Sequence, residues 1–135
     1  MADIKLKKDL LAVLKRIFNE QGDIFLFAYL FGSRAGETFS ESSDTDIAVY
    51  TNNRGNKDYF DIKTDLYLRL SRDLRQNDID IVIMNQCTNI LLLNQIITHG
   101  QVLYDKNESD RIDYELKILH RAIDFKTQRK MAMGV

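Results

Sequence analysis

The sequence predicts a mixed α/β fold of the α+β kind, with a small mixed sheet flanked by helices and a long C-terminal helix. Helical and strand-like patterns alternate along the chain, and no proline interrupts any of them. The length of 135 residues, with 44% hydrophobic and 29% charged residues, is typical of one globular domain. We therefore expect a single domain that spans residues 1–135.

Apolar residues spaced three and four apart predict four helices. They span residues 4–19, 58–75, 90–98 and the stretch from about 107 onward. The apolar face of the first helix consists of Leu10, Leu14, Ile17 and Phe18. The stripe of the second consists of Tyr59, Ile62, Leu66, Leu70 and Leu74. Thr88 or Asn89 can cap the third helix, and Gly100 ends it.

Short apolar or alternating runs predict the strands. The aromatic-rich run IFLFAYLF suits a buried strand, and DIDIVIM alternates in polarity and is rich in β-branched residues. The expected strands span residues 24–31, 47–50 and 78–84, with a short edge strand at 101–104.

Charge and cysteine content narrow the classes of function. The formal net charge of −1 gives no global basic field, so we expect no direct nucleic-acid binding. No stretch approaches the roughly 20 apolar residues needed to span a bilayer, so we expect no membrane partner. Cys87 is the only cysteine, which excludes an intramolecular disulfide. This fits a reducing compartment, and we expect a cytoplasmic protein in which Cys87 is a small core or loop residue.

The acidic stretch before the second strand predicts a metal site. Asp44 and Asp46 are two residues apart at the start of a strand, so their side chains project to the same face. Glu37 and Glu41 lie just upstream, and no basic residue separates Glu37 from Asp46. Such a cluster is unfavourable without a cation, and Mg²⁺ prefers carboxylate, water and phosphate oxygens.

The turn that follows the first strand supplies groups for a phosphate. Gly32 allows the backbone to approach a ligand closely, and Ser33 offers a hydroxyl and an amide. The guanidinium of Arg34 can neutralise phosphate charge. Together with the acidic pair, this stretch has both phosphate donors and metal ligands, as a nucleoside-triphosphate site requires.

The third predicted strand offers a further carboxylate. Asp80 lies between Ile79 and Ile81, so we expect it to be buried and to need a metal partner. Asp78 shares its face but lies at the strand entrance, where we expect a solvated residue.

These residues resemble the motif of the polymerase-beta-like nucleotidyltransferases, in which a Gly-Ser turn precedes an Asp-x-Asp and a third aspartate on a later strand. Gly32-Ser33, Asp44, Asp46 and Asp80 match that order and spacing. The similarity extends over nearly the whole chain and is close to the minimal nucleotidyltransferase (MNT) antitoxins of HEPN–MNT toxin–antitoxin pairs. The family's second glycine is one residue earlier here, at Gly36, which leaves the roles of Arg34 and Gly36 open.

The resemblance implies a polymerase-beta-like nucleotidyltransferase fold and a protein adenylyltransferase. Such an antitoxin uses ATP and Mg²⁺ to transfer AMP to a tyrosine of a partner HEPN ribonuclease toxin. Ser33 would contact the triphosphate, and Asp44 and Asp46 would ligate the metal. Asp80 would complete the catalytic and metal site and help to activate the tyrosine hydroxyl.

Two other functions remain open from the sequence. One is nucleotidyl transfer to a small molecule such as an aminoglycoside, although those enzymes usually carry a further substrate-binding domain. The other is an antitoxin that acts by binding and masking alone, against which the three intact aspartates argue.

The last predicted helix carries more apolar surface than one intramolecular contact requires. Ile112, Leu116, Leu119 and Ile123 form one line on it, with Ile118, Ala122 and Phe125 beside them. Two interpretations stay open, a surface for a partner and a simple cap on the sheet.

Overall fold

The computed structural model describes residues 2–32, 44–52 and 58–132. The helices are α1 (Ala2–Glu20), α2 (Tyr59–Leu74), α3 (Ile90–His99) and α4 (Glu108–Ala132), and short 3-10 turns are η1 (Gly22–Ile24) and η4 (Met84–Gln86). The strands are β1 (Phe25–Phe31), β2 (Thr45–Thr51), β3 (Ile79–Ile83) and β4 (Gln101–Asp105). Each predicted helix and strand is present in the described chain, with ends that differ by a few residues.

The four strands form one mixed sheet in the order β3-β2-β1-β4. Strand β1 pairs antiparallel with both β2 and β4, whereas β2 and β3 are parallel and joined through α2. The strand predicted at 101–104 is therefore an edge strand, as expected. Strand β3 forms the other edge.

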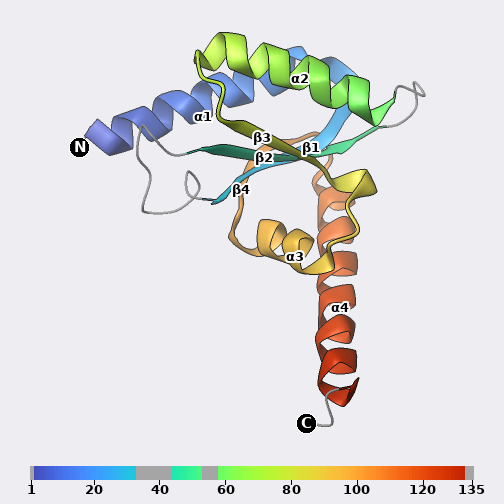
Figure 1. Ribbon diagram of the computed structural model, residues 1–135. Coiled ribbons are helices and arrows are strands. Elements are labelled where there is room, and N and C mark those ends of the chain that lie inside the picture. The colour runs from blue at the N-terminus through green and yellow to red at the C-terminus, as the bar shows by residue number, and fades with distance from the viewer. Residues whose placement is uncertain (1, 33–43, 53–57, 133–135) are drawn as a thin grey trace.

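Helices cover both faces of the sheet, and each face has its own apolar core (Figure 1). Helices α1 and α2 lie on one face, where their predicted stripes pack with the side chains of Ile47, Val49 and Ile81. Helices α3 and α4 lie on the other face, where Ile96 and Ile118 pack with aromatic residues of β1. The fold class predicted from the sequence is thus confirmed.

Side-chain caps explain where two of the helices begin. The side chain of Asp58 accepts a hydrogen bond from the backbone of Phe60 at the start of α2. Asn89 caps α3 by accepting from the amide of Leu92, which decides between the two predicted caps in favour of Asn89. Helix α2 ends at Arg75, whose φ of 55° lies in the left-handed region.

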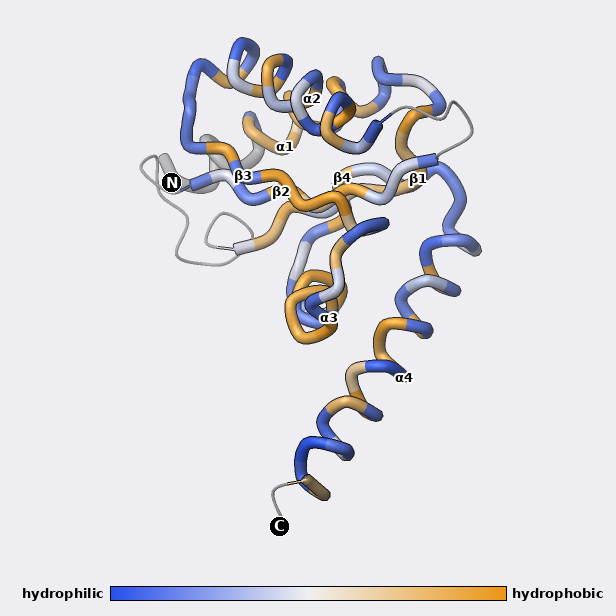
Figure 2. Tube along the Cα trace, turned by 45° about the vertical axis from the view of Figure 1, so that its right-hand side comes forward, coloured by the Kyte–Doolittle hydropathy of each residue, from blue (hydrophilic) through white to orange (hydrophobic). Residues whose placement is uncertain are grey.

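Only the first half of α4 is anchored to the sheet. The hydroxyl of Tyr29 in β1 donates a 2.8 Å hydrogen bond to Glu115, and Arg111 bridges Glu115 and Asp105 at 2.8 Å each. Burial and the acceptor carboxylate of Glu115 raise the pKa of Tyr29 far above its ordinary value, so it remains a donor. Beyond this anchor, α4 runs past α3 and away from the sheet (Figure 2).

Among the described residues, no helix is long and apolar enough to cross a membrane.

Candidate active site

The predicted site residues meet where β1 ends and β2 and β3 begin. Asp44 is an exposed residue directly before β2, and Asp46 is the second residue of that strand and is half-buried. Phe31, the last residue of β1, pairs with Asp46 across the sheet. The chain therefore leaves β1 beside the strand that carries the two carboxylates.

Position 32 requires a glycine because of its backbone conformation and its contact with Asp46. Its φ of +73° is one that residues with a Cβ rarely adopt. A Cβ added there would also overlap the Oδ2 atom of the Asp46 carboxylate. The glycine of the predicted phosphate turn thus has a second role that the sequence did not reveal, since it makes room for the acidic side chain.

Register places Asp80 directly beside Asp46. The two residues are partners in the parallel pairing of β2 with β3, and partners in neighbouring strands project to the same face. Burial, followed by the charges of Asp80 and Asp44, raises the pKa of Asp46 above the ordinary aspartate value. The three carboxylates therefore interact, although Asp80 is separated from the other two by more than thirty residues of chain.

The predicted burial of Asp80 is wrong, because its side chain is exposed. Residues Ile79, Ile81 and Ile83 of β3 point to the face covered by α1 and α2, and they are buried. Asp80 alternates with them and points to the opposite face at the start of an edge strand. The described helices leave that end of the face open, so water can solvate the carboxylate.

A polar brace joins the beginnings of β2 and β3. The amide of Thr45 donates a 2.9 Å hydrogen bond to the carbonyl of Asp78. Gln76, in the turn after α2, donates to the hydroxyl of the buried Thr45 at 2.7 Å and to the Asp78 carbonyl at 3.3 Å. The brace holds the two strand ends in the register that pairs Asp46 with Asp80. The residue types in this turn do not indicate the brace, so it could not be predicted from the sequence.

The aspartates line an open hollow of about 330 Å³. Its lining consists of Asp44, Asp46, Asn77, Asp78, Ile79 and Asp80. Asp78 is exposed at the strand entrance, as predicted, but it also contributes to the lining. Four of the six lining residues are aspartates, which suits a cation or a ligand accompanied by cations.

The carboxylates of the hollow are the kind of ligand that a hard divalent cation prefers, but their side chains do not converge on one point. Carboxylates whose charges disfavour one another gain from a shared cation, and Asp46 is in that situation. In the described part of the chain, however, no three carboxylate, histidine or cysteine side chains converge closely enough to hold a metal ion. Side-chain rotation of the exposed Asp44 and Asp80 would be needed to share one.

The remaining predicted ligands lie outside the described residues. Ser33 and Arg34 of the phosphate turn are among these, as are the acidic residues Glu37 and Glu41.

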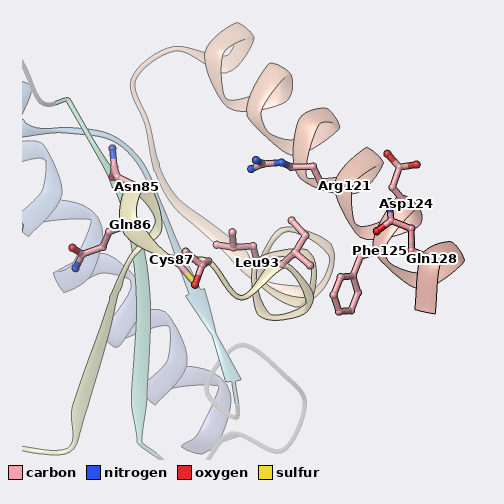
Figure 3. Close-up of a pocket in the computed structure, with 10 residues that line it drawn as sticks. Asn85, Gln86, Cys87, Leu93, Arg121, Asp124, Phe125 and Gln128 are labelled. Carbon is pink, nitrogen blue, oxygen red and sulfur yellow. The ribbon is translucent and has the colours of Figure 1, made fainter. Parts of the chain in front are cut away.

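A second and larger hollow of about 600 Å³ lies at the other end of β3, between the η4–α3 segment and α4 (Figure 3). Arg121 extends from α4 toward Cys87 and Leu93, and Phe125 contributes an aromatic wall. Cys87 is half-buried in a loop, as its sequence context predicted. Because Asn85 lines this hollow and lies two residues after the end of β3, the hollow is separate from the aspartates at the beginning of that strand.

Comparison with known proteins gives a family and a set of similar structures. The chain matches the family model described as Polymerase beta, Nucleotidyltransferase over residues 13–109. A comparison with curated protein sequences gives no significant match.

Several solved structures share the fold. One chain of a toxin–antitoxin structure with AMP-PNP has a TM-score of 0.71 and 24% identity, covering 89% of this chain and 94% of that one. One chain of the tri-AMPylated Shewanella oneidensis HEPN toxin in complex with MNT antitoxin has a TM-score of 0.70 and 20% identity. There the match covers 95% of this chain and 96% of the other.

Proposed function

Since this chain belongs to the polymerase beta nucleotidyltransferase family, we propose that it transfers AMP from ATP to a tyrosine of a HEPN ribonuclease toxin and so neutralises that toxin. The observation that carries the proposal is the pairing of Asp46 with Asp80 beside Gly32. It brings the carboxylates and the glycine turn of the family motif to one end of the sheet. In this proposal the whole chain, residues 1–135, is one cytoplasmic nucleotidyltransferase domain.

The similar structures support the substrate and the partner. One of them contains AMP-PNP, a non-hydrolysable analogue of ATP, and another contains an AMPylated HEPN toxin with its MNT antitoxin. A further similar chain, with a TM-score of 0.70 and 20% identity, comes from a toxin–antitoxin variant in which two aspartates two residues apart are glutamates. Asp44 and Asp46 have the same spacing here.

In the proposed reaction the tyrosine oxygen attacks the α-phosphorus of ATP. The new oxygen–phosphorus bond forms as the bond to the bridging oxygen of the leaving pyrophosphate breaks. Asp80 would help to activate the tyrosine hydroxyl by taking its proton, and its exposure in the lining of the hollow supports this role. Gly32, Ser33 and Arg34 would bind the triphosphate.

Asp44, Asp46 and Asp80 would hold Mg²⁺, which when bound neutralises phosphate charge and polarises the reacting phosphoryl group. The protein's own contribution is to keep the carboxylates together at the strand ends. The register of β2 with β3 and the Thr45–Gln76 brace supply that arrangement.

The test is to purify the chain with a HEPN ribonuclease encoded beside its gene and to incubate the pair with ATP and MgCl₂. Intact mass spectrometry should show one or more AMP units on the ribonuclease, and peptide mapping should place them on tyrosine. Asp46→Asn should still bind the ribonuclease but should lose the mass gain. Asp124→Asn on α4, an exposed aspartate that lines the second hollow and not the one with Asp46, is the matched control and should retain it.

The alternatives give different results in the same experiment. An antitoxin that acts by masking alone would inhibit the ribonuclease equally with ATP and with chelator, and no mass change would appear. Labelled AMP on an added aminoglycoside, with none on the ribonuclease, would indicate a small-molecule enzyme.

A further inference from the structure

Helix α4 has an apolar surface that its own chain does not cover. Ile118 and Ala122 face the body of the protein and are each 1% exposed. The apolar stripe of α4, as we call it, consists of Ile112 (40% exposed), Leu116 (50%), Leu119 (41%) and Ile123 (53%). The structure thus places Ile118 and Ala122 on a buried face and the four residues of the stripe on an exposed one, and Phe125, predicted beside the buried pair, is 42% exposed.

The two faces are distinct in helical geometry. At 100° per residue, the stripe is centred roughly 110° around the helix axis from Ile118 and Ala122. Packing of α4 on the sheet and α3 therefore leaves the stripe outside, and part of it lies where α4 runs away from the sheet (Figure 2). Apolar side chains in contiguous exposed rows mark interaction surfaces more often than isolated ones do.

We propose that the stripe binds the same stripe of a second copy of this chain, with the two α4 helices antiparallel. The spacing within the stripe is four, three and four residues, so it reads the same from either end. An antiparallel copy therefore brings Ile112 opposite Ile123, and Leu116 opposite Leu119, in one two-fold symmetric contact. The inference is independent of the proposed enzymatic function.

Charge supports this orientation. The first turn of α4 carries Glu108 and Asp110, and its last turn carries Arg129 and Lys130. Antiparallel helices place each acidic end beside the basic end of the other copy, whereas parallel helices would place like charges together.

The register set by the stripe also matches an individual charge pair. It brings Glu108 beside Lys126 of the second copy, on one flank of the stripe. Both side chains are exposed. Binding of a helix from an unrelated protein would not require the stripe to be complementary to itself in both spacing and charge.

The contact is small. Eight apolar side chains between two helices bury less than the 1,200–2,000 Å² that is typical of stable complexes, so we expect a reversible dimer. The experiment is sedimentation equilibrium of the full chain from about 1 µM to about 1 mM, a range that covers weak association. The wild-type chain should shift from monomer to dimer within it, and a monomer throughout would overturn the proposal.

Paired charge variants test the surface. A chain with Leu116→Lys and Leu119→Lys should dissociate at least about tenfold more readily, and so should a chain with Leu116→Glu and Leu119→Glu. Mixing the two should restore dimers, because each lysine then faces a glutamate. Leu68→Glu, on the exposed side of α2 at 60% exposure, is the control and should dimerise like the wild type.

Dimers that survive both double variants, or no rescue on mixing, would refute the stripe as the interface. Circular dichroism should show unchanged helix content, since all the substituted side chains are exposed. If the wild type is monomeric and the lysine variant instead loses binding to a ribonuclease, the stripe belongs to that heterologous partner and the proposal is wrong.

Orientation is tested by cross-linking in a Cys87→Ser background, which has no other cysteine. A chain with Ile112→Cys mixed with a chain with Ile123→Cys should form disulfide-linked heterodimers on mild oxidation. Each chain alone should cross-link far less, and a predominance of homodimers would show parallel helices.

Discussion

Replacing Asp46 with asparagine should stabilise the metal-free protein while removing its function. The half-buried carboxylate lies beside Asp80 in register and is also close to Asp44. Asparagine keeps the shape of the side chain and removes its charge. Both the burial cost of the charge and its repulsion from the neighbours are then lost.

The size of the effect follows from the geometry. Registered neighbours in adjacent strands place two carboxylates roughly 6 Å apart, where Coulomb's law gives about 0.7 kcal/mol in water and about 3 kcal/mol at an effective dielectric constant of 20. Because Asp80 is exposed, the value should be near the lower limit. We expect a gain on the order of 1 kcal/mol in the free energy of unfolding, which raises Tm by roughly 3–5 °C.

The gain should depend on pH in a defined direction. The pKa of Asp46 is raised in the folded protein, so folding disfavours its ionised form. The wild-type protein bears that cost at neutral pH and loses it as the pH falls, because at a pH well below the ordinary aspartate pKa of ~3.9 the side chain is protonated in both the folded and the unfolded state. The difference between variant and wild type should therefore be largest near pH 7 and should vanish near pH 3.

Thermal unfolding in EDTA across this pH range measures the effect, with Asp124→Asn as the control for an exposed aspartate away from the site. A variant that is less stable than the wild type at pH 7, or a difference that persists at pH 3, would refute the electrostatic account of the site.

Three further predictions concern the same end of the sheet. Asp80→Asn should abolish AMP transfer and Asp78→Asn should reduce it much less, because Asp80 is the register partner within the site; equal losses in a transfer assay would reject this choice. Gly32→Ala should lower Tm by several degrees more than Gly22→Ala, since both have positive φ but only Gly32 lies against a carboxylate. In calorimetry, ATP and Mg²⁺ should bind with positive coupling of ~1–3 kcal/mol, and equal ATP affinity with Mg²⁺ and with chelator would exclude a metal site.

Helix faces were predictable because they depend on local spacing. Ile62, Leu66 and Leu70 recur at helical intervals, and all three are buried in α2. The cap of α3 was narrowed to two neighbouring residues, since only a polar side chain directly before the helix can accept from its first free amides. Both properties are set by residues close together in sequence.

The surroundings of Asp80 were not predictable, because they depend on which helices cover which face. Alternation in β3 predicts two faces, but it does not say that only the face of Ile79 and Ile81 is covered at the start of the strand. The Gln76–Thr45 bond joins residues 31 positions apart and follows from the parallel pairing of β2 with β3, which has no local signature. The motif identifies the site residues in the sequence, whereas their solvent exposure can be determined only from the tertiary structure.

The exposure of Asp80 leads to a prediction about the role of the metal in folding. A buried carboxylate would need a cation to be stable, whereas the exposed Asp80 is solvated in its absence. The half-buried Asp46 does bear a cost, and that cost is small beside the apolar cores on both faces of the sheet. Removal of divalent ions with EDTA should therefore leave far-UV circular dichroism unchanged and should lower Tm only by the ligand-linkage amount, which Mg²⁺ and ATP restore together. If EDTA unfolds the protein, the metal has a structural role, and the carboxylates at the beginnings of β2 and β3 would be coupled to folding.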